Sequence, residues 1–206
     1  MAERMVIGNE ADRVRAAKIL KAGEIVVFPT DTVYGIGGDV HSSSAIKAIY
    51  NAKKRPTEKG LPVLLADVSD LLKVAKELSP LAQTLCEEHW PGPLTIIVHK
   101  RADLPTNLTP NDGVAVRVPD HAGTRKLIRL AGGALASSSA NIASEPAANS
   151  AIEAEESLGD KVAAILDGGL AQHQQPSTII DCRYDPPVLV RQGPLDLQLK
   201  ELAKFK

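Results

Sequence analysis

Apolar and polar positions follow two different periods along the chain, and each period predicts a different element. Apolar residues three or four positions apart predict helices at residues 10–22, 42–51, 68–78, 79–90, 121–131, 150–158 and 195–205. Short runs rich in β-branched residues predict strands at residues 24–28, 61–66, 94–99, 114–118, 134–137, 162–166, 177–181 and 188–191. Helices and strands that interleave in this way are typical of an α/β or α+β fold. We expect one domain over residues 1–206, built on a twisted, mixed, open sheet with flanking helices.

Composition and charge narrow the classes of protein that fit. Hydrophobic residues make up 44% of the chain and charged residues 24%, which is typical of a globular protein and argues against disorder. The formal net charge is -1, so overall charge gives no sign of a nucleic-acid binder, and any anion site must come from local clustering. Two Phe, three Tyr and one Trp are too few for a base-stacking surface.

The sequence gives no sign of a membrane or secreted protein. No apolar run reaches the ~20 residues that a membrane-spanning helix needs, and residues 1–9 have no apolar core of a signal peptide. Cys86 and Cys182 are too far apart for a local metal-binding pair, and buried packing explains both. We therefore expect a cytoplasmic protein.

Several common catalytic motifs are missing from the sequence. It has no G-x-x-x-x-G-K-[ST] loop, and the glycines at residues 35–38 lack the third glycine of a dinucleotide fingerprint. No G-x-S-x-G surrounds the serines at 137–139, and the five histidines form no short ligand spacing. These absences disfavour a P-loop enzyme, a Rossmann dehydrogenase, an α/β-hydrolase and a protein-held metal.

Two polar segments near predicted strand ends could bind a ligand. Residues 29–37 (Pro-Thr-Asp-Thr-Val-Tyr-Gly-Ile-Gly) place hydroxyls, one carboxylate and glycines after a strand, which suits either a small polar ligand or a plain glycine-rich turn. Residues 53–60 hold four basic residues and one acid in a predicted loop. Such cations can converge on a phosphate, although charge alone favours a solvated loop.

Three further segments add polar groups near strand ends. Arg117 lies within a strand of small and β-branched residues, where it needs an anionic partner if it points inward. The Ser-Ser-Ser-Ala-Asn run at 137–141 follows a strand and could bind a ligand or cap its own backbone. Residues 176–181 and 190–193 add a hydroxyl pair and a second arginine. Each segment alone is weak evidence for a site.

Taken together, these segments resemble the YrdC/Sua5/YciO family in order and separation. Residues 29–37 match the family pattern P-T-[DE]-T-V-Y-G-[LI]-G, and residues 90–95 match W-P-G-P-L-T. The family's K-x-R…S-x-N signature is met by Lys53, Arg55, Ser139 and Asn141. Three more blocks match at 117–119, 176–181 and 191–193. The resemblance covers roughly residues 10–195 and implies a YrdC-like fold with a large concave basic cavity, without the C-terminal extension of the Sua5 type.

The resemblance also implies an activity. Family enzymes are nucleotidyltransferases that combine L-threonine, bicarbonate and ATP into threonylcarbamoyl-AMP and release pyrophosphate. The product serves the N6-threonylcarbamoyladenosine modification at position 37 of tRNA. The partners implied are these three substrates, a downstream tRNA threonylcarbamoyl transferase complex and a tRNA or double-stranded RNA. Mg²⁺ is expected to arrive with the nucleotide.

The family's functional residues carry over by position. The threonine contacts implied are Thr32, Arg117, Ser137 and Ser177, with Arg117 placed to pair the carboxylate. The ATP contacts implied are Arg55, Lys59, Ser139 and Arg191, together with backbone around Gly113 and Ala147. Lys53 completes the basic wall in this scheme, and Asn141 orders the serine loop. Lys53, Arg55, Ser139 and Asn141 form the expected catalytic set.

One departure from the family keeps alternatives open. Many members have a histidine near the threonine site where this chain has Leu64. A related carbamoyl-adenylate enzyme with another acceptor is therefore one alternative, and an RNA-binding or ribosome-maturation module is another. The sequence offers no evident general base for the threonine amine, although Asp31 is conceivable.

Overall fold

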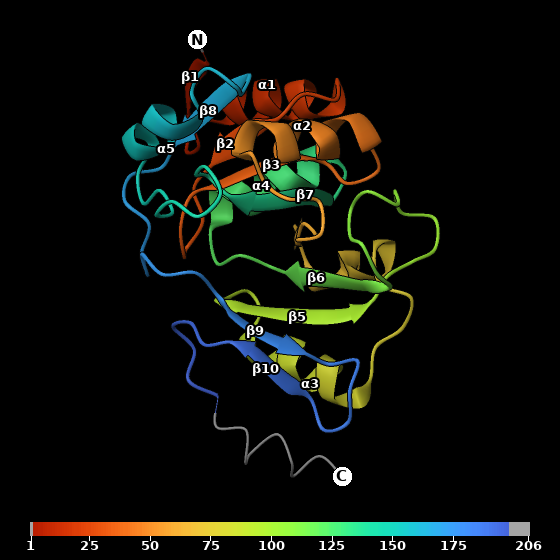
Figure 1. Ribbon diagram of the computed structural model, residues 1–206. Coiled ribbons are helices and arrows are strands. Elements are labelled where there is room, and N and C mark those ends of the chain that lie inside the picture. The colour runs from red at the N-terminus through yellow and green to blue at the C-terminus, as the bar shows by residue number, and fades with distance from the viewer. Residues whose placement is uncertain (1, 198–206) are drawn as a thin grey trace.

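The computed structural model describes residues 2–197, and ten strands in this part of the chain form one sheet (Figure 1). The strands are β1 (Glu3–Val6), β2 (Val26–Phe28), β3 (Gly35–Asp39), β4 (Val63–Leu65), β5 (Leu94–His99), β6 (Gly113–Arg117), β7 (Ala134–Ser139), β8 (Ala164–Asp167), β9 (Thr178–Asp181) and β10 (Val188–Arg191). Their order across the sheet is β1-β8-β2-β3-β7-β4-β6-β5-β9-β10. Parallel pairs such as β4 with β6 occur beside antiparallel pairs such as β3 with β7, so the prediction of a mixed open sheet is confirmed.

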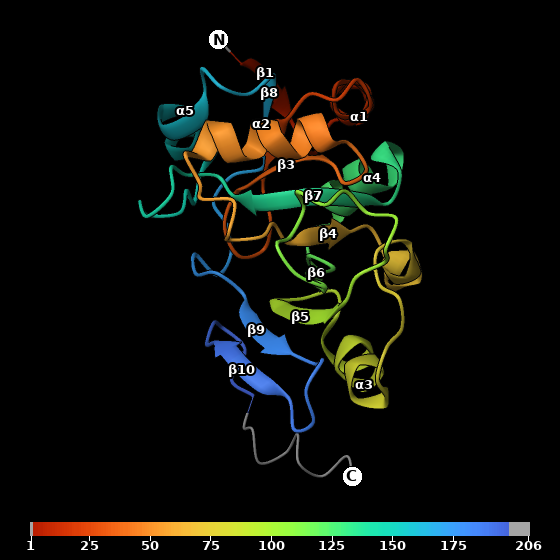
Figure 2. The ribbon, with the colours of Figure 1, turned by 45° about the vertical axis from the view of Figure 1, so that its right-hand side comes forward.

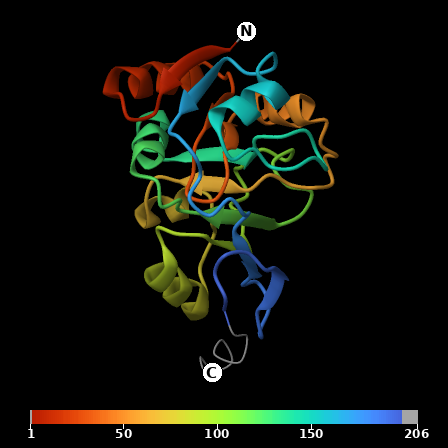
Figure 3. The same cartoon turned by 90° about the vertical axis from the view of Figure 1, so that its left-hand side faces the viewer.

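Helices flank this sheet. They are α1 (Glu10–Lys21), α2 (Ser43–Lys53), α3 (Pro80–His89), α4 (Ala122–Ala131) and α5 (Ala151–Leu158), with a 3-10 helix η1 (Val68–Lys73). Figure 3 shows α1 and α4 on one side of the upper strands and α2 and α5 on the other. Figure 2 shows α3 against the lower strands, beside β5.

Alternation along the strands divides the core into two clusters. In β2, Val26 and Phe28 pack with α1 and α4, whereas Val27 packs with α2 and α5. The same alternation holds in β4, where Leu64 belongs to the α1 and α4 cluster and its two neighbours to the other. Successive side chains of a strand point to opposite faces, so strands covered on both sides become apolar throughout.

Two observed strands were not predicted, and one predicted helix is partly wrong. The unpredicted strands are β1, a short, charged stretch at the edge of the sheet, and β3, whose glycines give no strand pattern. The helix predicted at 68–78 is wrong beyond residue 73, because the chain turns there and Ala75 forms a bridge with Lys100. The helix predicted at 195–205 lies mostly outside the described residues.

Candidate functional site

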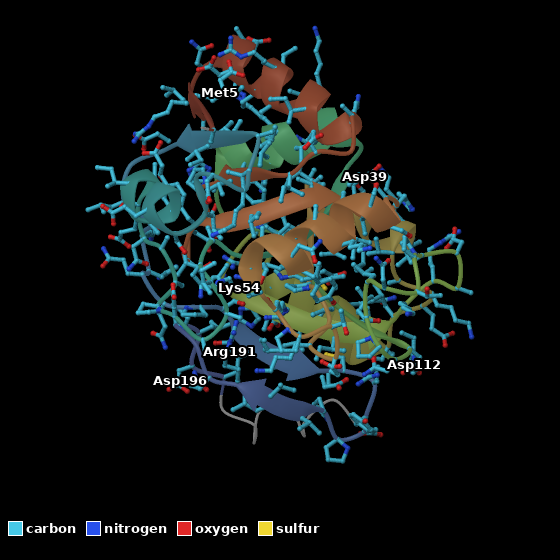
Figure 4. The ribbon with its side chains drawn as sticks, turned by 45° about the horizontal axis from the view of Figure 1, so that its top comes forward. Met5, Asp39, Lys54, Asp112, Arg191 and Asp196 are labelled. Carbon is cyan, nitrogen blue, oxygen red and sulfur yellow. The ribbon has the colours of Figure 1, made fainter. Side chains whose placement is uncertain are left out.

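A cavity of about 370 Å³ opens on the lower strands, where α1 and α4 no longer cover the sheet. Alternate residues of β5 and β6 face it: Thr95 and Ile97 line the cavity, while Leu94, Ile96 and Val98 pack in the core. The loops after β2 and α2 and the end of β7 complete its walls. Figure 4 shows Arg191 of β10 and Lys54, at the end of α2, on the same side of the molecule.

Most of the residues predicted for the site line this one cavity. They are Thr32, Arg55, Gly113, Arg117, Ser137, Ser139, Ser177 and Arg191. They come from segments up to 159 positions apart between Thr32 and Arg191, so only the fold brings them together. Thr32, Arg117, Ser137 and Ser177 are buried and form the deep half of the lining, whereas Arg55 is half-buried and Arg191 exposed, in the more open half. The two halves adjoin, because Arg191 lies against Ser177.

The loop after β2 owes its shape to a hydroxyl turn. The Thr30 hydroxyl donates to the carbonyl of Val33 at 2.6 Å and accepts from the backbone N–H of Thr32 at 3.2 Å. A short side chain that bonds its own following backbone stabilises such a turn. The turn fixes Thr32 with its hydroxyl accepting from Nη1 of Arg117 at 2.6 Å.

Arg117 forms a buried ion pair in the deep half. Its Nη2 lies 2.5 Å from Oδ1 of Asp31, and its Nε donates to the carbonyl of Gly92 at 2.9 Å. Burial lowers the pKa of Arg117, and the charge of Asp31 opposes that effect. A buried guanidinium needs such a partner, so the prediction that an inward Arg117 requires an anion is confirmed, with Asp31 as the anion.

Two other cavity arginines, Arg55 and Arg191, have only neutral carbonyl and hydroxyl oxygens as partners among residues 2–197. Arg55 donates to the carbonyls of Lys59 at 2.8 Å and Gly60 at 3.0 Å. Arg191 donates to the carbonyl of Ser177 at 2.9 Å and to its hydroxyl at 3.3 Å. Burial lowers the pKa of both, and the positive charge of Arg117 adds to the effect at Arg191. Each therefore presents a charge that an anionic ligand would compensate.

Lys53 does not line the cavity, contrary to the place in the basic wall given to it above. It is buried, and Nζ donates to the carbonyl of Ser139, to the carbonyl of Asn141 at 2.6 Å and to Oδ1 of Asn141 at 3.3 Å. Burial, with a smaller effect from Arg55, lowers its pKa to about 8. Lys53 thus ties the end of α2 to the serine loop.

Asn141 orders the loop in the manner expected. Its side-chain amide donates to the carbonyls of Ile142 and Glu145, each at 2.8 Å. Lys59 and Ala147 lie outside the cavity lining, although the carbonyl of Lys59 holds Arg55. Asn141 also lies outside the lining, so the structure separates the predicted set into cavity residues and the supporting residues Lys53, Lys59 and Asn141. The prediction that Ala147 lies at the nucleotide is not supported by the lining within residues 2–197.

Sequence reasoning missed Arg183, which also lines the cavity. Its Nε and Nη2 bind the two carboxylate oxygens of Asp181 at 3.0 and 2.7 Å, and Nη1 binds Asp112 at 2.9 Å. A methyl group on Gly113 would come within 2.5 Å of this guanidinium, so glycine leaves room for it. The sequence signal that could have indicated this ion pair is an acidic and a basic residue two positions apart, at 181 and 183.

Two features are absent from the part of the chain that the structure describes: a metal-binding cluster and a membrane-spanning helix. Between residues 2 and 197 there is no group of three or more His, Cys, Asp or Glu side chains arranged to hold a metal ion. Within the same range, no helix is both long and apolar enough to cross a membrane.

Fold and site define an α/β protein with a cavity for small ligands. In this cavity a buried guanidinium and hydroxyls lie beside two arginines that have no carboxylate partner in the described part of the chain. A family model named Sua5/YciO/YrdC, described as "Telomere recombination", matches residues 18–193. The chain belongs to this family.

The curated relatives share one name. A threonylcarbamoyl-AMP synthase of Pyrococcus abyssi is 40% identical over 89% of this chain, and one of Bacillus subtilis is 38% identical over 90%. The chain spans 54% of the length of each of these two. A shorter protein of the same name from Vibrio campbellii is 35% identical, with 85% of this chain and 96% of the relative covered.

Solved structures agree with the fold. The structure of P. abyssi Sua5 complexed with L-threonine has a TM-score of 0.91 and 38% identity, and the match covers 99% of this chain and 59% of that one. E. coli YciO has a TM-score of 0.88 and 25% identity, with 97% and 99% covered.

Proposed function

We propose that this protein is an L-threonylcarbamoyladenylate synthase, a nucleotidyltransferase that makes threonylcarbamoyl-AMP and pyrophosphate from L-threonine, bicarbonate and ATP. The observation that carries the proposal is the division of one cavity into a buried half suited to an amino acid and an open half with two arginines suited to phosphates. The names of relatives that match nearly all of this chain, and the L-threonine complex of P. abyssi Sua5, support it.

In the first step the unprotonated amine of threonine attacks the carbon of bicarbonate. A C–N bond forms, water leaves, and the product is a carbamate. Arg117 binds the threonine carboxylate through N–H groups that its protein partners leave free, while Thr32, Ser137 and Ser177 supply hydroxyls around it. Holding the amine beside its target converts an encounter into an intramolecular reaction, which is the main contribution expected from this buried half.

In the second step a carbamate oxygen attacks the α-phosphorus of ATP. The new P–O bond replaces the bond to the β-phosphate, and pyrophosphate leaves. Arg55 and Arg191 stabilise the charge that develops on the phosphate oxygens, because fixed cations in a partly dry site act strongly on such charge. Mg²⁺ bound to the triphosphate would further neutralise it. The product would pass to a tRNA threonylcarbamoyl transferase in the cytoplasm.

A second candidate function is the same chemistry with another amino acid. Leu64 lines the cavity and pairs with Arg117 across β4 and β6, so it presents an apolar wall in the amino-acid half. A larger or more apolar acceptor would gain from this contact.

Pyrophosphate release tests the proposal. The purified chain is incubated with ATP, Mg²⁺ and bicarbonate, and each of the twenty amino acids is added in turn, with a sample lacking bicarbonate as the control. We expect release that depends on both threonine and bicarbonate. Release with a different amino acid alone would replace the proposal by the second candidate, and release with none would refute both.

A further inference from the structure

Asp31 lies behind the site, and its place there does not fit the one role considered for it above, that of a general base for the threonine amine. It is 2% exposed and is not among the residues that line the cavity, whereas its neighbours Thr30 and Thr32 are. Its Oδ1 accepts from Nη2 of Arg117 at 2.5 Å and from the backbone N–H of Asp120 at 3.0 Å. Its carbonyl accepts from the backbone N–H of His173 at 2.8 Å. Asp31 thus joins three segments around the deep half: its own loop, residues 117–120 and the loop that carries His173.

Asp31 and Thr32 together fix the plane of one guanidinium. Arg117 donates from Nη2 to the carboxylate of Asp31, from Nη1 to the hydroxyl of Thr32 and from Nε to the carbonyl of Gly92. A guanidinium has five N–H groups in a rigid fork. The three contacts leave one N–H on each Nη free within the described structure, and Arg117 lines the cavity while Asp31 does not. The free pair is therefore available to a ligand in the cavity.

The ion pair between Asp31 and Arg117 also points to Asp31 as the residue that prepares the deep half for a ligand. An unpaired guanidinium at this depth is strongly unfavourable, and the Asp31 carboxylate compensates its charge. The pair is neutral overall before a ligand arrives. Recognition of a carboxylate in the deep half then depends on two oriented donors rather than on net charge, so it depends on what orients them.

We infer that Asp31 is a positioning residue for amino-acid binding: it holds Arg117 in the orientation in which its free N–H groups face the carboxylate of the substrate. The inference rests on the proposed function and adds to it a residue that never touches the substrate. Oδ2 of Asp31 is buried and has no hydrogen-bond partner within residues 2–197, so only Oδ1 performs this task. An asparagine whose amide oxygen replaces Oδ1 can accept the same two hydrogen bonds.

Three variants separate positioning from a general loss of structure. In Asp31→Ala the acceptor is gone and Arg117 can turn, so KM for L-threonine should rise at least tenfold while KM for ATP stays within twofold. Asp31→Asn keeps the acceptor, so its KM for threonine should be at least threefold lower than that of Asp31→Ala. Asp181→Ala is the spatial control, because it removes another buried carboxylate paired with a cavity arginine and should leave the threonine KM unchanged.

Three results would contradict a positioning role of Asp31. A threonine KM in Asp31→Ala within twofold of wild type, an equal rise of both KM values, or an Asp31→Asn protein no better than Asp31→Ala would overturn the inference. If Asp31→Ala does not fold, Asp31→Leu takes its place, because it keeps the volume of the side chain and removes the acceptor: a threonine KM at least tenfold above wild type with unchanged ATP KM supports positioning, and a smaller rise refutes it.

Failure of the proposed function gives a different pattern. Wild-type protein that releases no pyrophosphate with threonine contradicts the function, and calorimetric dissociation constants for L-threonine then replace the KM values in the same comparison. Wild-type protein with neither activity nor threonine binding overturns the function and the inference together.

Discussion

The four arginines of the cavity differ in their partners, and the difference divides the cavity. Arg117 and Arg183 are paired with carboxylates of Asp31 and Asp181. Arg55 and Arg191 have only carbonyl and hydroxyl oxygens as partners within residues 2–197. A guanidinium already neutralised serves to orient a ligand, whereas one that is partly buried without a counter-charge gains most from an incoming anion. At the scale of single residues, the two arginines that have no carboxylate partner within residues 2–197 are therefore the ones assigned to the triphosphate.

Lys53 allows a test of the link between the serine loop and α2 through pH. Its pKa is lowered from the ordinary 10.5 to about 8 in the folded protein. Between these two values the unfolded chain binds a proton that the folded protein has released, so the free energy of unfolding rises with pH across this window. From pH 7.5 to 9.5 the wild type should gain on the order of 2 kcal/mol relative to Lys53→Met, which cannot titrate. Denaturant unfolding of both proteins at the two pH values measures it, and parallel pH dependences would contradict the assignment.

At the scale of elements, β3 shows how a strand can be built from glycines. A methyl group on Gly37 would lie 2.8 Å from the ring of Phe28, and one on Gly35 would lie 3.1 Å from it. The ring of Phe28 in β2 therefore packs directly on the backbone of β3. This close packing positions the loop between the two strands, which carries Thr32 and Asp31.

Gly37→Ala should consequently destabilise the protein. Overpacking of a full core at this position is expected to lower the free energy of unfolding by about 1–3 kcal/mol. Gly8→Ala is the matched control, because a methyl group there has no atom within 4 Å, and its effect should stay within about 0.5 kcal/mol. Urea denaturation compares the two, and equal effects would show that the contact with Phe28 does not matter.

The same strand shows where sequence reasoning reaches its limit. Runs of apolar and β-branched residues predicted eight of the strands, because the side chains of those strands themselves form the pattern that is typical of a strand. In β3 the signal lies in a contact with a ring on the neighbouring strand, which no local pattern contains. The helix expected at 68–78 failed for the reverse reason, since its spacing was helical but its end bridges to Lys100 instead.

At the scale of the whole molecule, the cavity is a product of sheet order. The first half of the chain supplies residues such as Thr32, Arg55 and Thr95, and segments far along the sequence supply others, such as Arg117 of β6, Ser137 of β7 and Arg191 of β10. Family motifs predicted which residues gather here, because motifs record types and order. They could not tell that Lys53 supports the loop from behind, or that Asp31 pairs with Arg117, because both facts depend on which side of a strand or loop faces the cavity.

The central claim is that one cavity holds the nucleotide in one half and the amino acid in the other. The most direct test compares the two KM values in Arg55→Ala and Arg117→Ala. Loss of a charge-assisted contact of about 1.5–3 kcal/mol should raise KM for ATP about ten- to hundredfold in Arg55→Ala, with KM for threonine nearly unchanged. Arg117→Ala should show the opposite pattern. The same pattern in both variants, or wild-type KM for ATP in Arg55→Ala, would contradict the account.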